Sequence, residues 1–100
     1  MNFYLCKIKN EEKEILYRLL QYSLFEESAT DLNEMNSEAL FEYKYFDLYF
    51  SDNTREAYFI KQKETNKLLG FAMINKHMQK FEEGHSIAEY LVIPKYRRNG

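Results

Sequence analysis

Apolar and polar positions in the first third of the chain predict a strand followed by a helix. Residues 3–9 end in alternating apolar and polar side chains, which is typical of a strand. From residue 11 to about residue 25, apolar side chains recur every three to four positions, as on one face of a helix. They are Ile15, Leu16, Leu19, Leu20 and Leu24. Residues 26–37 are polar and rich in Ser, Thr, Asp and Asn, which predicts a loop.

A second helix is predicted from Ser37 to about Phe50. Ser is a preferred N-cap residue, and large apolar residues follow it at helical spacing. They are Leu40, Phe41, Tyr45, Leu48 and Tyr49.

The second half of the chain changes to strand-like periodicity. Residues 57–62 and 68–75 predict two strands, and the polar residues 64–67 predict the turn of a hairpin between them. Gly70 inside the second of these strands indicates a bulge or the close approach of another backbone. Residues 76–85 predict a loop that contains Gly84, and residues 86–93 predict a last strand that stops at Pro94.

The predicted order β-α-α-β-β-β defines an α+β fold, with a mainly antiparallel sheet and helices packed on it. A chain of 100 residues has room for one such domain. With three Gly and one Pro, the composition argues against a turn-rich all-β fold.

The net charge and its distribution along the chain limit the kinds of binding partner that are expected. The formal net charge of −2 gives no support for nucleic-acid binding. Residues 26–56 hold nine acidic and two basic side chains. This stretch is either a solvated helix face or an acidic rim that attracts a cationic partner.

The sequence predicts a cytoplasmic protein that does not bind a membrane. No run approaches 18 apolar residues, and no basic and apolar leader precedes the first strand. The single cysteine, Cys6, lies in an apolar run, which predicts a buried and unreactive thiol in a reducing compartment. His77 and His85 lack the Cys residues and short spacings of zinc sites, so no metal is expected.

A basic loop follows the last predicted strand. Lys95, Arg97 and Arg98 precede Gly100, without an acidic residue among them. Such a loop directs backbone N–H groups at an anion, and glycine permits the close approach. A basic surface turn has the same composition, so these residues alone leave both interpretations open.

Residues 92–100, Val-Ile-Pro-Lys-Tyr-Arg-Arg-Asn-Gly, resemble the acetyl-CoA signature of the GNAT superfamily of N-acetyltransferases. That signature is a hydrophobic strand, commonly a proline, and then (Q/R)-x-x-G-x-(G/A). Arg97 falls on the Q/R position and Gly100 on the first glycine. The predicted order of elements also matches the first half of the GNAT fold. The resemblance implies a single GNAT-like domain over residues 1–100, lacking the C-terminal helix and strands of the family.

The resemblance implies transfer of an acetyl group from acetyl-CoA to a primary amine, by direct attack in a ternary complex. The co-substrate is acetyl-CoA and no metal is involved. By the resemblance, backbone groups of the last strand would pair with the pantetheine arm, and the basic loop would cradle the pyrophosphate. The strand residues are Tyr90, Leu91 and Val92, and the loop residues are Arg97, Arg98, Asn99 and Gly100.

Glu89 is the candidate general base, because it is the only acid in an otherwise apolar strand where burial would raise its pKa. The alternatives are a carboxylate that faces solvent or pairs with a lysine, and a base further upstream, nearer Ser86. The acceptor is expected to be a small-molecule or peptide amine. The acidic stretch and its aromatic residues favour a cationic, polyamine-like or aminoglycoside-like amine. The aromatic residues are Phe41, Tyr43, Tyr45 and Phe46, and their helical spacing is more typical of a core.

Two other functions stay open at this stage. One is a non-catalytic domain of the same fold that binds CoA or a protein. The other is a half-domain that completes its sheet with a second copy, as a homodimer, because an exposed last strand favours self-association.

Overall fold

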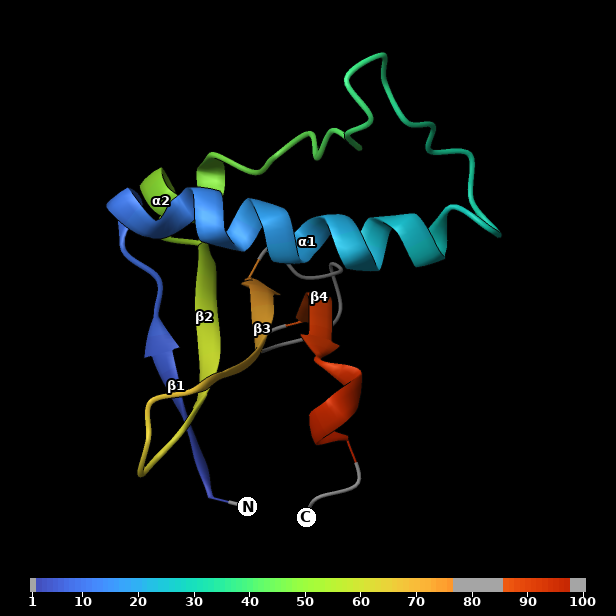
Figure 1. Cartoon of the computed structure of the whole chain (residues 1–100). Helices are drawn as coiled ribbons and strands as arrows, with labels where there is room; N and C mark the ends of the chain where they lie inside the picture. Colours follow the sequence, from blue (N-terminus) through green and yellow to red (C-terminus); the bar gives the residue numbers. More distant parts are fainter. Residues whose placement is uncertain (1, 77–85, 98–100) are drawn as a thin grey trace.

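A four-stranded antiparallel sheet with helices packed on it forms the framework of the protein (Figure 1). The computed structural model describes residues 2–76 and 86–97. The strands lie in the order β1-β2-β3-β4, so each strand pairs with its neighbour along the chain. Their bounds are Phe3–Lys7 for β1, Arg55–Gln62 for β2, Leu68–Asn75 for β3 and Ser86–Val92 for β4. The α+β fold and the antiparallel sheet predicted from the sequence are confirmed.

Two α-helices and two 3-10 helices complete the described chain. They are η1 (Asn10–Glu12), α1 (Lys13–Glu27), α2 (Leu48–Ser51) and η2 (Pro94–Tyr96). Helix α1 packs over β3 and β4, whereas α2 packs against β2. None of the helices within residues 2–76 and 86–97 is long and apolar enough to span a membrane.

The core lies between the sheet and α1. Leu16, Leu20 and Leu24 are buried at intervals of four, so they form one stripe along the helix. Alternate residues of the strands face this stripe, as the two-residue period of a strand requires. The buried strand residues on this face are Ala57 and Phe59 of β2, Phe71 and Met73 of β3, and Leu91 of β4. The predicted helix and strands are therefore confirmed, within two residues at their ends.

The predicted helix from Ser37 to Phe50 is wrong in extent, because only Leu48–Ser51 are helical. Ala39 has a φ of 64°, which an α-helix does not allow. The side-chain oxygen of Asn36 accepts hydrogen bonds from the N–H groups of Glu38 and Leu40, at 2.9 and 3.1 Å. This local turn competes with the helix. Among the aromatic residues that follow, Phe41 is buried and Tyr43 and Phe46 pack against the core, all from a loop.

Gly70 lets β3 and β4 approach each other closely, as its position in the sequence predicted. A Cβ atom at Gly70 would overlap the carbonyl oxygen of Leu91 and lie 3.0 Å from the Cα of Val92. The register also shifts beside it, since Ile60 pairs with Gly70 and Lys61 with Leu68. The predicted bulge and close contact are both present. The close contact brings the backbone of β4, where the predicted site lies, directly against β3, whereas the bulge lies between β2 and β3.

Candidate functional site

Glu89 lies on the face of β4 that is covered by α1. It pairs with Met73, and Leu91 pairs with Phe71, two core residues without solvent exposure. The register then shifts, because Ile74 pairs with Ile87, which leaves Ala88 as an extra residue in β4. A bulge of this kind changes the direction of the side chains next to it. Glu89 is thus a half-buried acid at the edge of the core, beside a bulge.

The surroundings of Glu89 favour its neutral form. Its Oε1 atom is buried and has no hydrogen-bond partner within the described residues. Burial raises the pKa of Glu89 to about 8, and the carboxyl group of Glu27 adds to this through a hydrogen bond and its charge. Asp31 contributes a smaller repulsion. A carboxyl group with this pKa exchanges its proton near neutral pH, as a general base must.

Tyr43 interacts electrostatically with this carboxyl group and contacts a second tyrosine, Tyr49. Burial raises the pKa of Tyr43, and the nearby groups of Tyr49, Glu89 and Glu27 raise it further. The rings of Tyr43 and Tyr49 lie 6.3 Å apart, and Tyr49 is buried in the core. We call the five residues Glu27, Asp31, Tyr43, Tyr49 and Glu89 the Glu89 cluster. It joins the end of α1, the loop after it, α2 and β4.

The four aromatic residues predicted to line an acceptor rim do not share one environment. Phe41 is buried, and Tyr43 and Phe46 pack against the core. Tyr45 is exposed, and its ring already stacks with the cationic groups of Lys44 and Arg55, at 5.4 and 5.1 Å. Of the four, Tyr43 is the one that interacts electrostatically with Glu89.

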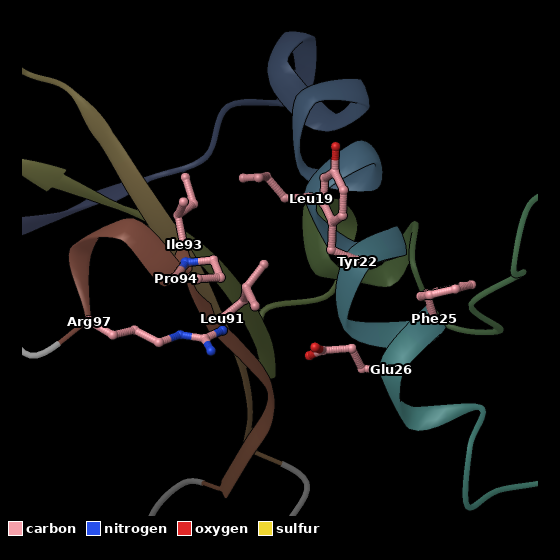
Figure 2. A pocket seen from close by; sticks show the side chains of 8 residues that line it. All are labelled: Leu19, Tyr22, Phe25, Glu26, Leu91, Ile93, Pro94 and Arg97. Carbon is pink, nitrogen blue, oxygen red and sulfur yellow. The ribbon is translucent and has the colours of Figure 1, made fainter.

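A pocket of about 450 Å³ lies between α1 and the end of β4 (Figure 2). Its walls are mainly apolar, with Glu26 on α1 and Arg97 after η2 pointing toward one another from opposite sides. The apolar lining residues are Leu19, Tyr22, Phe25, Leu91, Ile93 and Pro94. Two residues predicted to bind the cofactor, Leu91 and Arg97, therefore line one cavity.

The outer edge of β4 is open within the described residues, because β4 pairs there with β3 alone. The N–H of Ile93 donates to Leu69 of β3, at 2.8 Å. Backbone groups alternate in direction along a strand, so those of Tyr90 and Val92 point to the open edge. One of these groups already has a partner, because the Nε of Arg97 donates a hydrogen bond to the Val92 carbonyl oxygen, at 2.7 Å. The edge thus presents hydrogen-bonding groups to an extended ligand.

Several predicted site residues lie outside the described residues. They are Arg98, Asn99 and Gly100 of the basic loop, and His77 and His85 with the rest of the predicted loop 77–85. Within residues 2–76 and 86–97, no group of three His, Cys, Asp or Glu side chains is placed to hold a metal ion.

Glu27, Asp31 and Tyr43 were not predicted as partners of Glu89. The first two were counted only as part of the acidic stretch, and Tyr43 only as one of four aromatic residues. Nothing in the sequence around Glu27 or Asp31 indicates that either residue lies near the last strand. The contact depends on how α1 crosses the sheet.

Comparison with known families matched residues 18–100 to the acetyltransferase (GNAT) family. The matched segment contains the Glu89 cluster, the pocket and the basic loop. Neither the curated proteins nor the solved structures gave a match.

Proposed function

Because the chain belongs to the acetyltransferase (GNAT) family, we propose that it transfers an acetyl group from acetyl-CoA to a primary amine. The observation that carries the proposal is the arrangement of β4. This strand holds Glu89, with its raised pKa, two residues from Leu91 in the wall of the pocket. A proton acceptor and a place for an extended co-substrate thus lie on the same strand.

The open edge of β4 and its pocket fit the pantetheine arm of acetyl-CoA. Pantetheine carries amide groups along an apolar chain, and the outward backbone groups of Tyr90 and the N–H of Val92 offer partners for such amides. The apolar side chain of Leu91 lines the adjoining cavity. Arg97 stands at the end of the strand, where its charge would attract the pyrophosphate together with Arg98, Asn99 and Gly100.

Glu89 is proposed as the general base. A primary amine is largely an ammonium ion at neutral pH, and it must lose a proton before its nitrogen can attack the thioester carbonyl. Glu89 takes that proton. The amine nitrogen then attacks the thioester carbonyl, and the new C–N bond replaces the C–S bond. The nitrogen loses its second proton as the amide forms, and the departing thiolate of CoA takes up a proton and leaves as the thiol. The chain supplies no covalent nucleophile in this scheme.

The acidic neighbours of Glu89 support a cationic acceptor. Glu27 and Asp31 lie close enough to Glu89 for their charges to raise its pKa. The same charges attract an amine that carries further positive groups, such as a polyamine-like or aminoglycoside-like compound. The position of Glu27 at the end of α1 and of Asp31 in the loop after it supports an acceptor on the helix-covered face of β4.

The test is turnover of acetyl-CoA by the full chain, followed by thiol release, with cationic, neutral and acidic amines. We expect transfer to cationic amines, and a loss of about a hundredfold or more in kcat for Glu89→Gln. Glu64→Gln is the matched control, because Glu64 lies exposed in the hairpin turn and should keep the wild-type rate. Binding of acetyl-CoA without turnover by any amine would favour a non-catalytic member of the family instead.

A further inference from the structure

The loop between α1 and α2 is held by a side-chain clamp at its middle. The amide oxygen of Gln21, on α1, accepts a hydrogen bond from the backbone N–H of Phe41, at 2.8 Å. The amide nitrogen of Gln21 donates to the carbonyl oxygen of the same residue, at 2.9 Å. The hydroxyl of Tyr17, one helical turn earlier, donates to that carbonyl as well, at 3.0 Å.

This clamp satisfies the backbone of a buried residue. The ring of Phe41 is 4% exposed, so its N–H and C=O need partners that water does not supply. One side-chain amide pairs with both groups, as a neighbouring strand would. The three hydrogen bonds therefore set the position and direction of the chain at Phe41.

The clamp lies two residues before Tyr43, a member of the Glu89 cluster. Tyr43 packs against the core and interacts electrostatically with both Glu89 and Glu27. Between Phe41 and Tyr43 the described chain has no helix or strand of its own to place the tyrosine. The chain around Tyr43 is held by Gln21 at Phe41, and by the N–H of Phe46, which donates to the Tyr43 carbonyl at 3.1 Å.

We infer that Gln21 is a positioning residue for the proposed reaction: its amide holds Phe41 against α1 and thereby places Tyr43 beside the Glu89 carboxyl. The inference rests on the proposed function for its catalytic meaning. Gln21 itself touches neither the acceptor nor acetyl-CoA in this scheme. It acts through the loop that carries Tyr43.

Loss of the clamp is expected to change the titration of Glu89. The groups that face Glu89 are Glu27 from α1, and Asp31 and Tyr43 from the loop. If the loop moves away, water reaches Glu89 and its pKa falls from about 8 toward the ordinary range of a carboxyl group. Glu27 stays on its helix, so the fall is partial.

The experiment compares Gln21→Met with Gln62→Met in the full chain. Methionine keeps the length and helix preference of glutamine but cannot form the two hydrogen bonds. Gln62 is the matched control, since its amide oxygen accepts a hydrogen bond from Thr65 within the distant hairpin. Tyr17→Phe removes one hydrogen bond to the same carbonyl and gives a milder variant that retains the Gln21 pair.

Three readouts are needed. Hydrogen exchange of the Phe41 amide should accelerate at least about tenfold in Gln21→Met, as expected for the loss of its partner. The Glu89 pKa, followed by NMR of labelled glutamate side chains, should fall. For the acceptor, kcat/KM should drop about tenfold, while the KM for acetyl-CoA stays within about twofold. Gln62→Met should match the wild type in all three, and Tyr17→Phe should lie between.

The outcomes separate the inference from the function on which it rests. Faster exchange at Phe41 with an unchanged Glu89 titration would overturn the positioning role, because packing of the Phe41 ring would then place Tyr43. If Gln21→Met does not fold, the same three readouts on Tyr17→Phe decide. If the wild type transfers no acetyl group, the proposed function fails, whereas exchange and titration still test the clamp.

Discussion

The guanidinium Nε of Arg97 donates to the carbonyl oxygen of Val92, at 2.7 Å, five residues back along the chain. The contact folds the start of the basic loop back onto the open edge of β4. It keeps the positive charge of Arg97 at the mouth of the pocket, facing Glu26 across it (Figure 2). One residue thus protects an unpaired strand edge and marks the proposed site of the pyrophosphate.

Replacing Arg97 by Glu is expected to weaken acetyl-CoA binding. The change removes a hydrogen bond to β4 and puts a negative charge beside a pyrophosphate, so we expect the Kd to rise about ten- to a hundredfold. Calorimetric titration of the full chain with acetyl-CoA measures this. Arg18→Glu makes the same change of charge at an exposed site on α1 and is the control. Equal affinities for the two variants would contradict the assignment of Arg97.

Replacing Gly70 by Ala is expected to destabilise the fold by about 2–4 kcal/mol. The new methyl group would overlap the Leu91 carbonyl, and that atom belongs to a paired backbone that cannot turn away. Urea unfolding at constant pH measures the change. A loss below about 0.5 kcal/mol would mean that β3 and β4 do not approach as closely as described.

Replacing Ala39 by Gly distinguishes between the observed loop and the helix predicted for this segment. In a helix, the change would lower stability by about 1 kcal/mol. With a φ of 64°, alanine is strained and glycine is not, so we expect the variant to be as stable as the wild type or slightly more stable. Urea unfolding decides, and a marked loss of stability would restore the helical prediction.

Glu89 is expected to make the protein less stable as the pH rises. Its folded pKa, about 8, lies above the ordinary glutamate value of 4.5. Between these values the unfolded chain releases the proton and the folded chain keeps it, so the free energy of unfolding falls as the pH increases. Below the unfolded pKa the contribution is fully present, and above the folded pKa it is lost.

Glu89→Gln removes this dependence. Relative to the wild type, the variant should gain stability between pH 5 and pH 8.5, as shown by the midpoints of urea unfolding at the two pH values. Glu64→Gln, in the exposed hairpin turn, should show no such gain. Parallel pH profiles for Glu89→Gln and the wild type would be incompatible with a protonated Glu89 in the folded state.

Most elements with a regular apolar period were predictable because such a period favours one type of element. Leu16, Leu20 and Leu24 repeat as a helix requires, and they are buried in one stripe of α1. The hairpin of β2 and β3 follows from two apolar runs separated by a short polar turn. The segment from Ser37 to Phe50 also has helical spacing, yet most of it is a loop. Within it, the backbone N–H of Phe41 donates a hydrogen bond to the side chain of Gln21, twenty residues away. A local pattern contains no signal of such a partner.

The candidate site likewise contains some residues that the sequence identified and others that only the structure showed. Glu89 stands out in the sequence because it is the one acid in an apolar strand, and Arg97 because it follows a strand that ends at proline. The residues that set the pKa of Glu89 come from α1 and the loop after it. Neither Glu27 nor Tyr43 differs in its sequence context from the other acids and aromatic residues nearby.

The sequence by itself determined the order of the elements, the antiparallel sheet, the family resemblance and the strand that carries the site. These depend on period, turn chemistry and a short motif, all of which are local. Only the tertiary structure decided that a second long helix is replaced by a clamped loop, and that Glu89 is half-buried against Glu27 and Tyr43. Those features arise where α1 crosses β4, because burial and charge act between groups that are close in space, however far apart they lie along the chain.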